Sequence, residues 1–153
     1  MCAPLRHNFE TSKQSLKKHL LNEDFDLNSK VYGLVSTKPF LELAWCLKND
    51  LDLPFVRVDD VHWLMSRQPF YSPIYEYVNL MTETTFSLVR NKADSGWLAN
   101  EYKTIDAFLV ETNFSSMFTL KLSEISKSKW IQYCFEVDVQ TLRKPSQHRL
   151  DIN

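Results

Sequence analysis

The chain has 153 residues, a formal net charge of −1 and 44% hydrophobic residues. This length fits one domain with a buried core, and the hydrophobic content argues against a disordered chain. The near-neutral charge excludes an overall field that would recruit nucleic acid or an anionic membrane, so only local patches could do so. Glycine occurs only at Gly33 and Gly96, which excludes a glycine-rich phosphate-binding loop.

Cysteine usage and hydropathy bear on the compartment. Cys2, Cys46 and Cys134 are odd in number and widely separated, and no signal peptide precedes them. We therefore expect reduced thiols in a cytoplasmic protein. The longest uninterrupted apolar run is only a few residues, so we expect no segment that spans a membrane.

The N-terminal part is predicted to be mostly connection. Residues 1–10 are expected to be loose, and the sequence Thr-Ser-Lys-Gln at 11–14 has the form of a capping box, which predicts a short helix over about 12–21. An acidic loop follows over 23–28. The apolar run 31–35 then predicts a first strand that is central in its sheet.

A long amphipathic helix is predicted next. Ser36 or Thr37 can cap it, with Pro39 tolerated in the first turn. The helix is expected to end at 49–50, and a second strand follows at 55–58. One face of the helix is apolar and wide enough to pack on a sheet, and it carries Phe40, Leu43, Ala44 and Leu47.

The middle of the chain predicts an antiparallel meander. Residues alternate with period two over 61–65 and again over 74–81, with a loop over 66–73 between these strands. A strand over 86–90 follows after a short connection, which implies a hairpin. In the strand 74–81 the alternation places Tyr75 and Tyr77 opposite Ile74, Val78 and Leu80.

The last part repeats the strand–helix–strand order. A loop over 91–96 leads through a polar hinge at Glu101 into a strand over 106–111, which should join the meander to the final unit. Ser115 or Ser116 can cap a second helix that ends near 127–129, and a strand over 130–137 follows. Asp138 can cap a short turn, and residues 145–153 are expected to form a frayed tail.

The element order is strand–helix–strand, a meander, then strand–helix–strand. It predicts a single α+β domain over 1–153, with a largely antiparallel sheet and two main helices on one face. The other sheet face is expected to be part polar and part aromatic.

Residues 98–109 resemble the signature of a small bacterial family called IPExxxVDY. Glu101, the three-residue spacer and Asp106 match, and Ile105 replaces Val; residues 99, 100 and 107 depart from the pattern's Ile, Pro and Tyr. Shorter matches at 43–45, 57–60 and 135–138 extend the resemblance to roughly 24–145. It implies a cytoplasmic protein of uncharacterised function without an assigned active site, and it leaves Glu101 and Asp106 as shared acids of unknown role.

Two chemical alternatives follow from polar residues. Asp59, Asp60, Glu101 and Asp106 could converge into a cation site or an acid–base pair. The simpler interpretation is that the first two shape a turn, Glu101 caps a bend and Asp106 pairs with Arg57 or Arg90. No catalytic residue and no cofactor are predicted. No metal site is predicted either, because His7, His19, His62 and His148 lie too far from the cysteines and from one another for a zinc site.

Two binding hypotheses use the aromatic residues. Tyr75, Tyr77 and Phe86, with Arg90 and Lys92 nearby, could stack the bases of RNA or single-stranded DNA. The leading hypothesis is a non-catalytic adaptor or regulatory domain, a monomer or a homodimer, that binds an unknown protein. Its expected contacts are an aromatic sheet face and a proline-bounded loop: Phe70, Tyr71, Tyr75 and Tyr77.

Overall fold

The computed structural model describes residues 29–58, 60–65, 68–113, 122–143, 146, 147 and 150, with side chains omitted at 61–69. The predicted loose segment 1–10, the predicted helix 12–21 and the acidic loop lie outside these residues, as does Asp59. The start of the second predicted helix also lies outside them.

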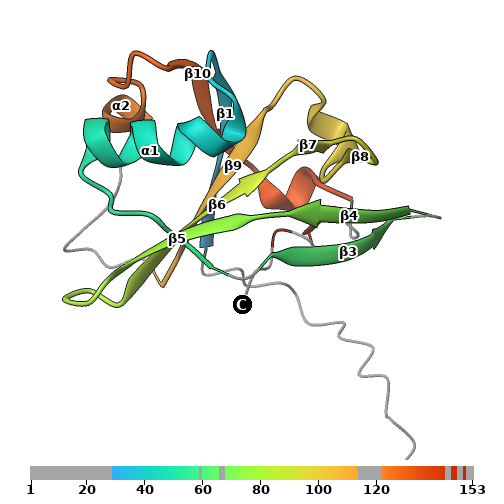
Figure 1. Cartoon of the computed structure of the whole chain (residues 1–153), viewed down its shortest axis with the longest axis horizontal. Coiled ribbons are helices and arrows are strands. Elements are labelled where there is room, and N and C mark those ends of the chain that lie inside the picture. The colour runs from blue at the N-terminus through green and yellow to red at the C-terminus, as the bar shows by residue number, and fades with distance from the viewer. Residues whose placement is uncertain are drawn as a thin grey trace, which may run out of the picture.

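A six-stranded antiparallel sheet forms the centre of the molecule, in the order β10-β1-β9-β6-β5-β2. This confirms the predicted α+β class and the largely antiparallel sheet. β9 lies between β1 and β6, so the strand after the Glu101 hinge joins the two halves of the sheet, as predicted (Figure 1). The strands are β1 (Ser29–Ser36), β2 (Val56–Arg57), β5 (Ile74–Asn79), β6 (Thr84–Arg90), β9 (Ala107–Thr112) and β10 (Ile131–Val137).

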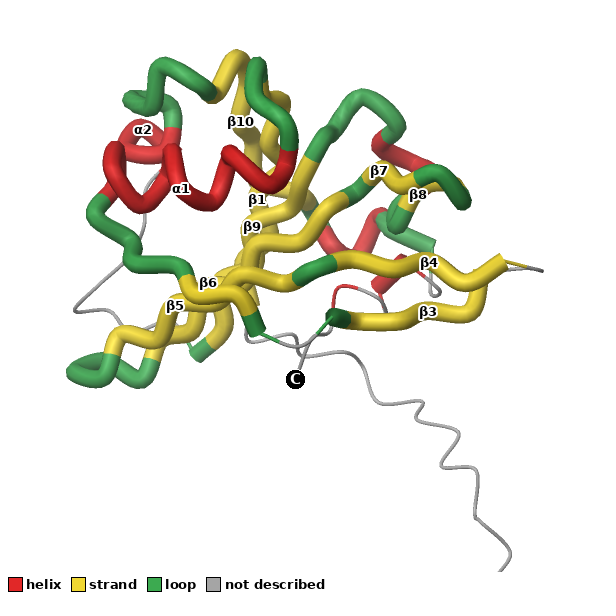
Figure 2. Tube along the Cα trace, viewed as in Figure 1, coloured by secondary structure: helices red, strands yellow, loops and turns green. Residues whose placement is uncertain are grey.

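Two α-helices, α1 (Phe40–Leu51) and α2 (Leu122–Ile125), lie on one side of this sheet (Figure 2). The N-cap of α1 is Pro39 in extended conformation, and its carbonyl accepts from the N–H groups of Glu42 and Leu43. The predicted side-chain cap from Ser36 or Thr37 is therefore wrong. Ser36 instead bonds within the preceding turn, where its hydroxyl accepts from the N–H of Lys38.

Two small hairpins occupy stretches for which loops were predicted. β3 (Val61–Met65) was expected, but it pairs with β4 (Gln68–Ser72), which covers most of the predicted loop 66–73. A two-stranded sheet leaves one edge of each strand open, so Pro69 can occupy β4 although it has no N–H to donate. β7 (Lys92–Ala93) and β8 (Gly96–Trp97) form the second hairpin, and Gly96 has a φ of +133°, which glycine adopts most readily.

The sheet has a hydrophobic cluster on each face. On the helix side, Leu43 and Leu47 of α1 pack over Leu34, Leu88 and Leu109 of the sheet. The opposite face carries an apolar cluster of its own, so the expectation of a part polar, part aromatic surface there is wrong. Strand residues of this second cluster are covered by residues from β4, the β8–β9 connection and the C-terminal segment, among them Phe70, Leu98, Ile105, Leu142 and Leu150.

The C-terminal part of the chain contributes to this second cluster. Asp138 caps the short 3-10 helix η2 (Val139–Thr141) through a hydrogen bond from the N–H of Gln140 at 3.0 Å, as predicted. Of the residues predicted to form a frayed tail, Ser146 and Leu150 are buried. The tail therefore packs against the domain at these positions.

Candidate functional site

Glu101 lies in the 3-10 helix η1 (Asn100–Tyr102) and holds the C-terminal segment. Its carboxylate accepts from the N–H of Arg143 at 2.8 Å and from the hydroxyl of Ser146 at 2.9 Å. Partial burial raises the pKa of Glu101, but these hydrogen bonds and the nearby Arg143 charge outweigh it, so the pKa lies below its ordinary value. The carboxylate therefore acts as a charged anchor between two distant parts of the chain.

Asp106 joins the start of β9 to the end of β1. Its side-chain Oδ2 accepts from the N–H of Ser36 at 2.8 Å, and its own N–H donates to the carbonyl of Leu34 at 2.9 Å. The side chain thus extends the β1–β9 ladder by one hydrogen bond. Its predicted pairing with Arg57 or Arg90 is wrong, because Arg57 pairs with Asp60 and Arg90 donates to the carbonyl of Tyr71.

The three described acids of the predicted cluster, Asp60, Glu101 and Asp106, have separate hydrogen-bond partners. Asp60 bonds Arg57 at 2.9 Å, whereas Glu101 and Asp106 bond the separate partners given above. Within the part of the chain that the structure describes, no group of three or more His, Cys, Asp or Glu residues could hold a metal ion. The carboxylate-cluster alternative therefore gains no support from the three acids whose positions are described.

Asn91 organises the stretch that carries both motif acids. Its side-chain amide donates to the carbonyls of Tyr102 and Ile105, at 2.8 and 2.9 Å, and its side-chain oxygen accepts from the N–H of Ala99 at 2.9 Å. The residue is fully buried. Sequence reasoning placed it at the start of a loop and gave it no role. A polar residue next to an apolar strand was the only signal, and many surface loops share it.

The predicted aromatic binding surface is mostly buried. Phe70 is 0% exposed in the second cluster, so it is unable to contact a partner. Tyr75 and Tyr77 pack on the helix side, Tyr75 against Phe40 at a ring-centroid distance of 5.8 Å. Of these four residues only Tyr71 is exposed, at 49%.

The period-two alternation was interpreted correctly, but the two faces were assigned the wrong way round. Tyr75 is the cross-strand partner of Leu88 and shares its face, which packs beneath α1. Ile74 lies on the other face and belongs to the second cluster. The same reversal removes the basis of the nucleic-acid hypothesis, because Phe86 is fully buried and Tyr77 stacks on it at 5.8 Å. Phe86 and the face of Tyr77 that stacks on it are therefore not accessible to a base.

Of the two described cysteines, Cys46 is buried and Cys134 is partly buried. Burial raises the pKa of Cys134 to about 11 and also raises the pKa of Cys46. A thiol with a raised pKa carries little thiolate at neutral pH, so these side chains are weak nucleophiles. Cys46 is one of the buried residues of α1.

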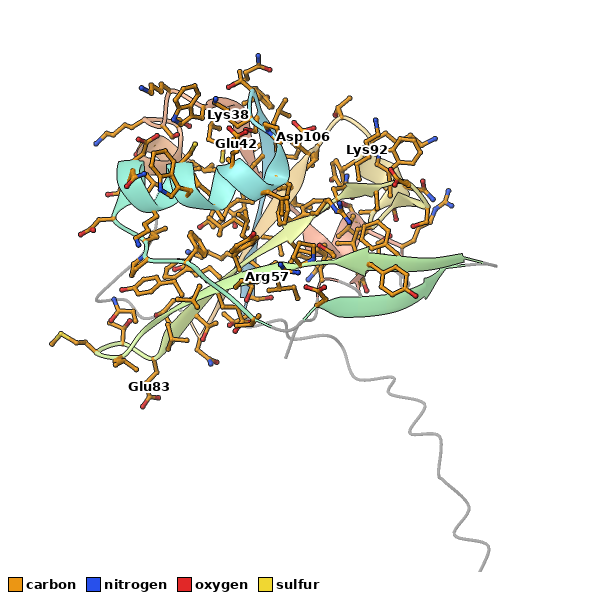
Figure 3. All side chains as sticks on the ribbon, viewed as in Figure 1. Lys38, Glu42, Arg57, Glu83, Lys92 and Asp106 are labelled. Atoms are coloured by element: carbon orange, nitrogen blue, oxygen red, sulfur yellow. The ribbon has the colours of Figure 1, made fainter. Side chains whose placement is uncertain are left out.

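An exposed apolar ridge runs along the outer side of α1. Leu41 is 63% exposed and Trp45 is 67% exposed. Both lie two positions from Leu43, which is a rotation of about 200° at 3.6 residues per turn, so they point away from the core. The sequence pattern assigned neither residue a function. Figure 3 shows Lys38 and Glu42 near the N-terminal end of the same helix, where they form an ion pair of 3.4 Å.

No described helix has the length and apolar character needed to cross a membrane. Comparison with protein-family models gives no match, and comparisons with curated proteins and with solved structures give none either. The resemblance to the IPExxxVDY signature stays a prediction. The candidate site therefore rests on the geometry of the α1 ridge.

Proposed function

We propose that this protein acts by binding another protein through the outer side of α1, with Trp45 as the main contact and Leu41 beside it. The observation that carries the proposal is the exposure of both side chains, 67% and 63%, on one surface of one helix. Tryptophan is enriched among the residues that dominate binding energy at protein interfaces. Single exposed apolar residues are common on protein surfaces, whereas contiguous exposed apolar patches mark interaction sites.

The helix that presents this ridge is held firmly. Its inner side buries Leu43 and Leu47, both 0% exposed. The segment before it is fixed by a hydrogen bond from the N–H of Thr37 to the carbonyl of Trp130 at 3.0 Å. Near its C-terminal end, the hydroxyl of Ser128 donates to the carboxylate of Asp50. A surface that is already ordered loses little conformational entropy on binding, which favours affinity.

The surroundings of the ridge fit an interface with an apolar centre and a polar rim. Lys38 and Glu42 form an ion pair at one end, and Lys48 is exposed in the last turn. Interfaces commonly place charged groups at such a rim, where they remain in water and influence the rate of association. Leu80 and Met81 are even more exposed, but they lie in the β5–β6 turn and belong to no helical face.

The proposal is tested by comparing two matched double variants of the full chain. L41A/W45A removes the ridge, whereas L80A/M81A removes two exposed apolar side chains elsewhere. Each tagged variant is used to capture proteins from a lysate of the host, and the captured proteins are quantified. We expect a defined set to be lost with the first variant and retained with the second.

Stability is measured in parallel. All four side chains are exposed. The free energy of unfolding of each variant should therefore differ from that of the original chain by no more than about 0.5 kcal/mol per replaced residue. If L41A/W45A captures the same proteins in the same amounts as the original chain, the proposal is wrong.

A further inference from the structure

β10 forms one end of the six-stranded sheet, and no other described strand pairs with its outer edge. The opposite end is β2, which has only two residues. Proteins usually protect a long edge strand with lysine, proline, a bulge or a covering segment. A register shift between Val35 and Ser36 disturbs the start of β10, but Tyr133 to Val137 pair regularly with β1. This regular part contains neither lysine nor proline and carries one charge, Glu136.

The direction of the backbone N–H and C=O groups of β10 follows from its pairing with β1. The carbonyl of Leu34 accepts from the N–H of Asp106, so Leu34 directs its backbone polar groups toward the β9 side. Because these groups alternate along a strand, Val35 directs its own toward β10, and its partner Tyr133 forms the ladder there. Cys134 and Glu136 therefore direct their N–H and C=O groups away from β1, to the open edge.

We propose that two copies of this chain pair through β10, antiparallel and across a two-fold axis near Cys134 and Phe135, so that their sheets become continuous. Each copy would then offer the outward groups of Cys134 and Glu136 to the other, and each hydrogen bond would occur twice. A two-fold axis is the commonest symmetry of protein oligomers. The formal charge of −1 per chain gives little long-range repulsion between copies.

The side chains of β10 suit this pairing. Tyr133 is 63% exposed, and its ring already contacts Phe135 of its own strand at 5.7 Å. In an antiparallel pair centred on Cys134 or Phe135, Tyr133 faces Phe135 or Val137 of the second copy, so its exposed ring gains an apolar neighbour. Glu136 faces Gln132 or Cys134 in these arrangements, so no like charges lie opposite each other. The inference is independent of the proposed function of α1.

The experiment is a sedimentation-velocity concentration series on the full chain. We expect a reversible monomer–dimer equilibrium. Glu136→Pro removes one outward N–H per copy and leaves the β1 ladder intact, so it should raise the dimer dissociation constant roughly 5- to 150-fold through two lost hydrogen bonds. Glu136→Ala keeps the N–H and is the matched control, for which we expect a much smaller change.

A second variant keeps the test decisive if the proline variant fails to fold. Tyr133→Ser retains all backbone groups and removes the exposed ring, so the dissociation constant should rise roughly 2- to 30-fold. A chain that stays monomeric over the whole accessible concentration range would overturn the proposal. So would a dimer whose affinity is unchanged in folded Glu136→Pro and in Tyr133→Ser, because its interface would lie elsewhere.

Discussion

At the level of single residues, Glu101 connects two parts of the chain that are far apart in sequence. Its carboxylate accepts hydrogen bonds from the N–H of Arg143 and the hydroxyl of Ser146. A capping side chain accepts hydrogen bonds from the first N–H groups of a helix in the same way. The carboxylate has to be ionised to accept both bonds well, so this contact should depend on pH.

The first prediction concerns this pH dependence. The pKa of Glu101 is lower in the folded protein than its ordinary value of 4.5, so its contribution to stability is present above that value and is lost as pH falls through the folded-state pKa. Cleavage of the C-terminal segment by an acid-active protease should therefore rise over this window. Glu101→Gln should raise cleavage at neutral pH and flatten the dependence. An unchanged profile in the variant would contradict the anchoring role.

Asn91 gives the second prediction. Replacement by Ala removes three side-chain hydrogen bonds. It leaves the buried N–H of Ala99 and the buried carbonyl of Ile105 without their partner, whereas the carbonyl of Tyr102 keeps the N–H of Ile105. Each such group costs about 1–3 kcal/mol when it stays unsatisfied, so we expect a loss of at least about 2 kcal/mol in the free energy of unfolding. Urea unfolding measures it. Exposed Asn100→Ala is the matched control and should change stability by less than about 0.5 kcal/mol.

Thiol reactivity gives the third prediction. With a pKa of about 11, Cys134 carries about a thousandth of its population as thiolate at pH 8. Alkylation of its peptide, followed by mass spectrometry, should be slow in the folded chain and fast after unfolding. Equal rates in the two states would show that the thiol is not buried as described.

At the level of elements, Gly33 determines how closely the β8–β9 connection approaches β1. A Cβ at this position would lie 2.5 Å from Cδ1 of Ile105 and 3.2 Å from the ring of Phe135. Ile105 is 1% exposed, so its side chain has little room to move away. The absence of a side chain at Gly33 thus permits the contact between the strand and the motif stretch.

The fourth prediction is a double-mutant cycle on this contact. Gly33→Ala should destabilise by about 1–3 kcal/mol through overpacking, and Ile105→Val by about 0.5–1.5 kcal/mol through lost burial. Because Val lacks the Cδ1 atom that the new Cβ would meet, the double variant should be less destabilised than the sum of the two. Additive effects in urea unfolding would show that the two positions do not interact.

The strands were largely predictable because period-two alternation and apolar runs are strong local signals. β1, β5, β6 and β10 lie close to their predicted ranges, and α1 begins within the predicted segment. β4 was not predicted because Pro69 argued for a loop, and only pairing with β3 makes an edge position available to it. In β10, strict period-two alternation would place Ile131 on the same face as Phe135, but the register shift turns Ile131 to the helix side.

The candidate site was harder to predict for a related reason. Alternation shows that Tyr75 and Ile74 lie on opposite faces of their strand, but it does not show which face the helices cover. That choice depends on contacts between distant segments, such as those of Phe40 with Tyr75. Likewise, Leu41 and Trp45 resemble ordinary core residues in the sequence, and only the position of α1 on the sheet shows that they point outward.

At the level of the whole molecule, the sheet is covered by an apolar cluster on each face, so most of its aromatic side chains serve the core. Among the described residues, the outer side of α1 and the open edge of β10 are two exposed surfaces suited to contact. We propose that the first contacts a different protein through apolar side chains and that the second contacts another copy of this chain through backbone groups. The two surfaces should be separable by mutation, because they share no residue.

We propose that α1 contacts another protein in the cell. The most direct measurement replaces single residues of the full chain with a photo-crosslinking amino acid in the host: Trp45 on the ridge, Leu80 in the β5–β6 turn as a control, and Tyr133 at the sheet edge. Illumination should give a discrete product with a different polypeptide from position 45 and none from position 80, whereas position 133 should link two copies of this chain. Equal products from positions 45 and 80, or no product from position 45, would contradict the claim.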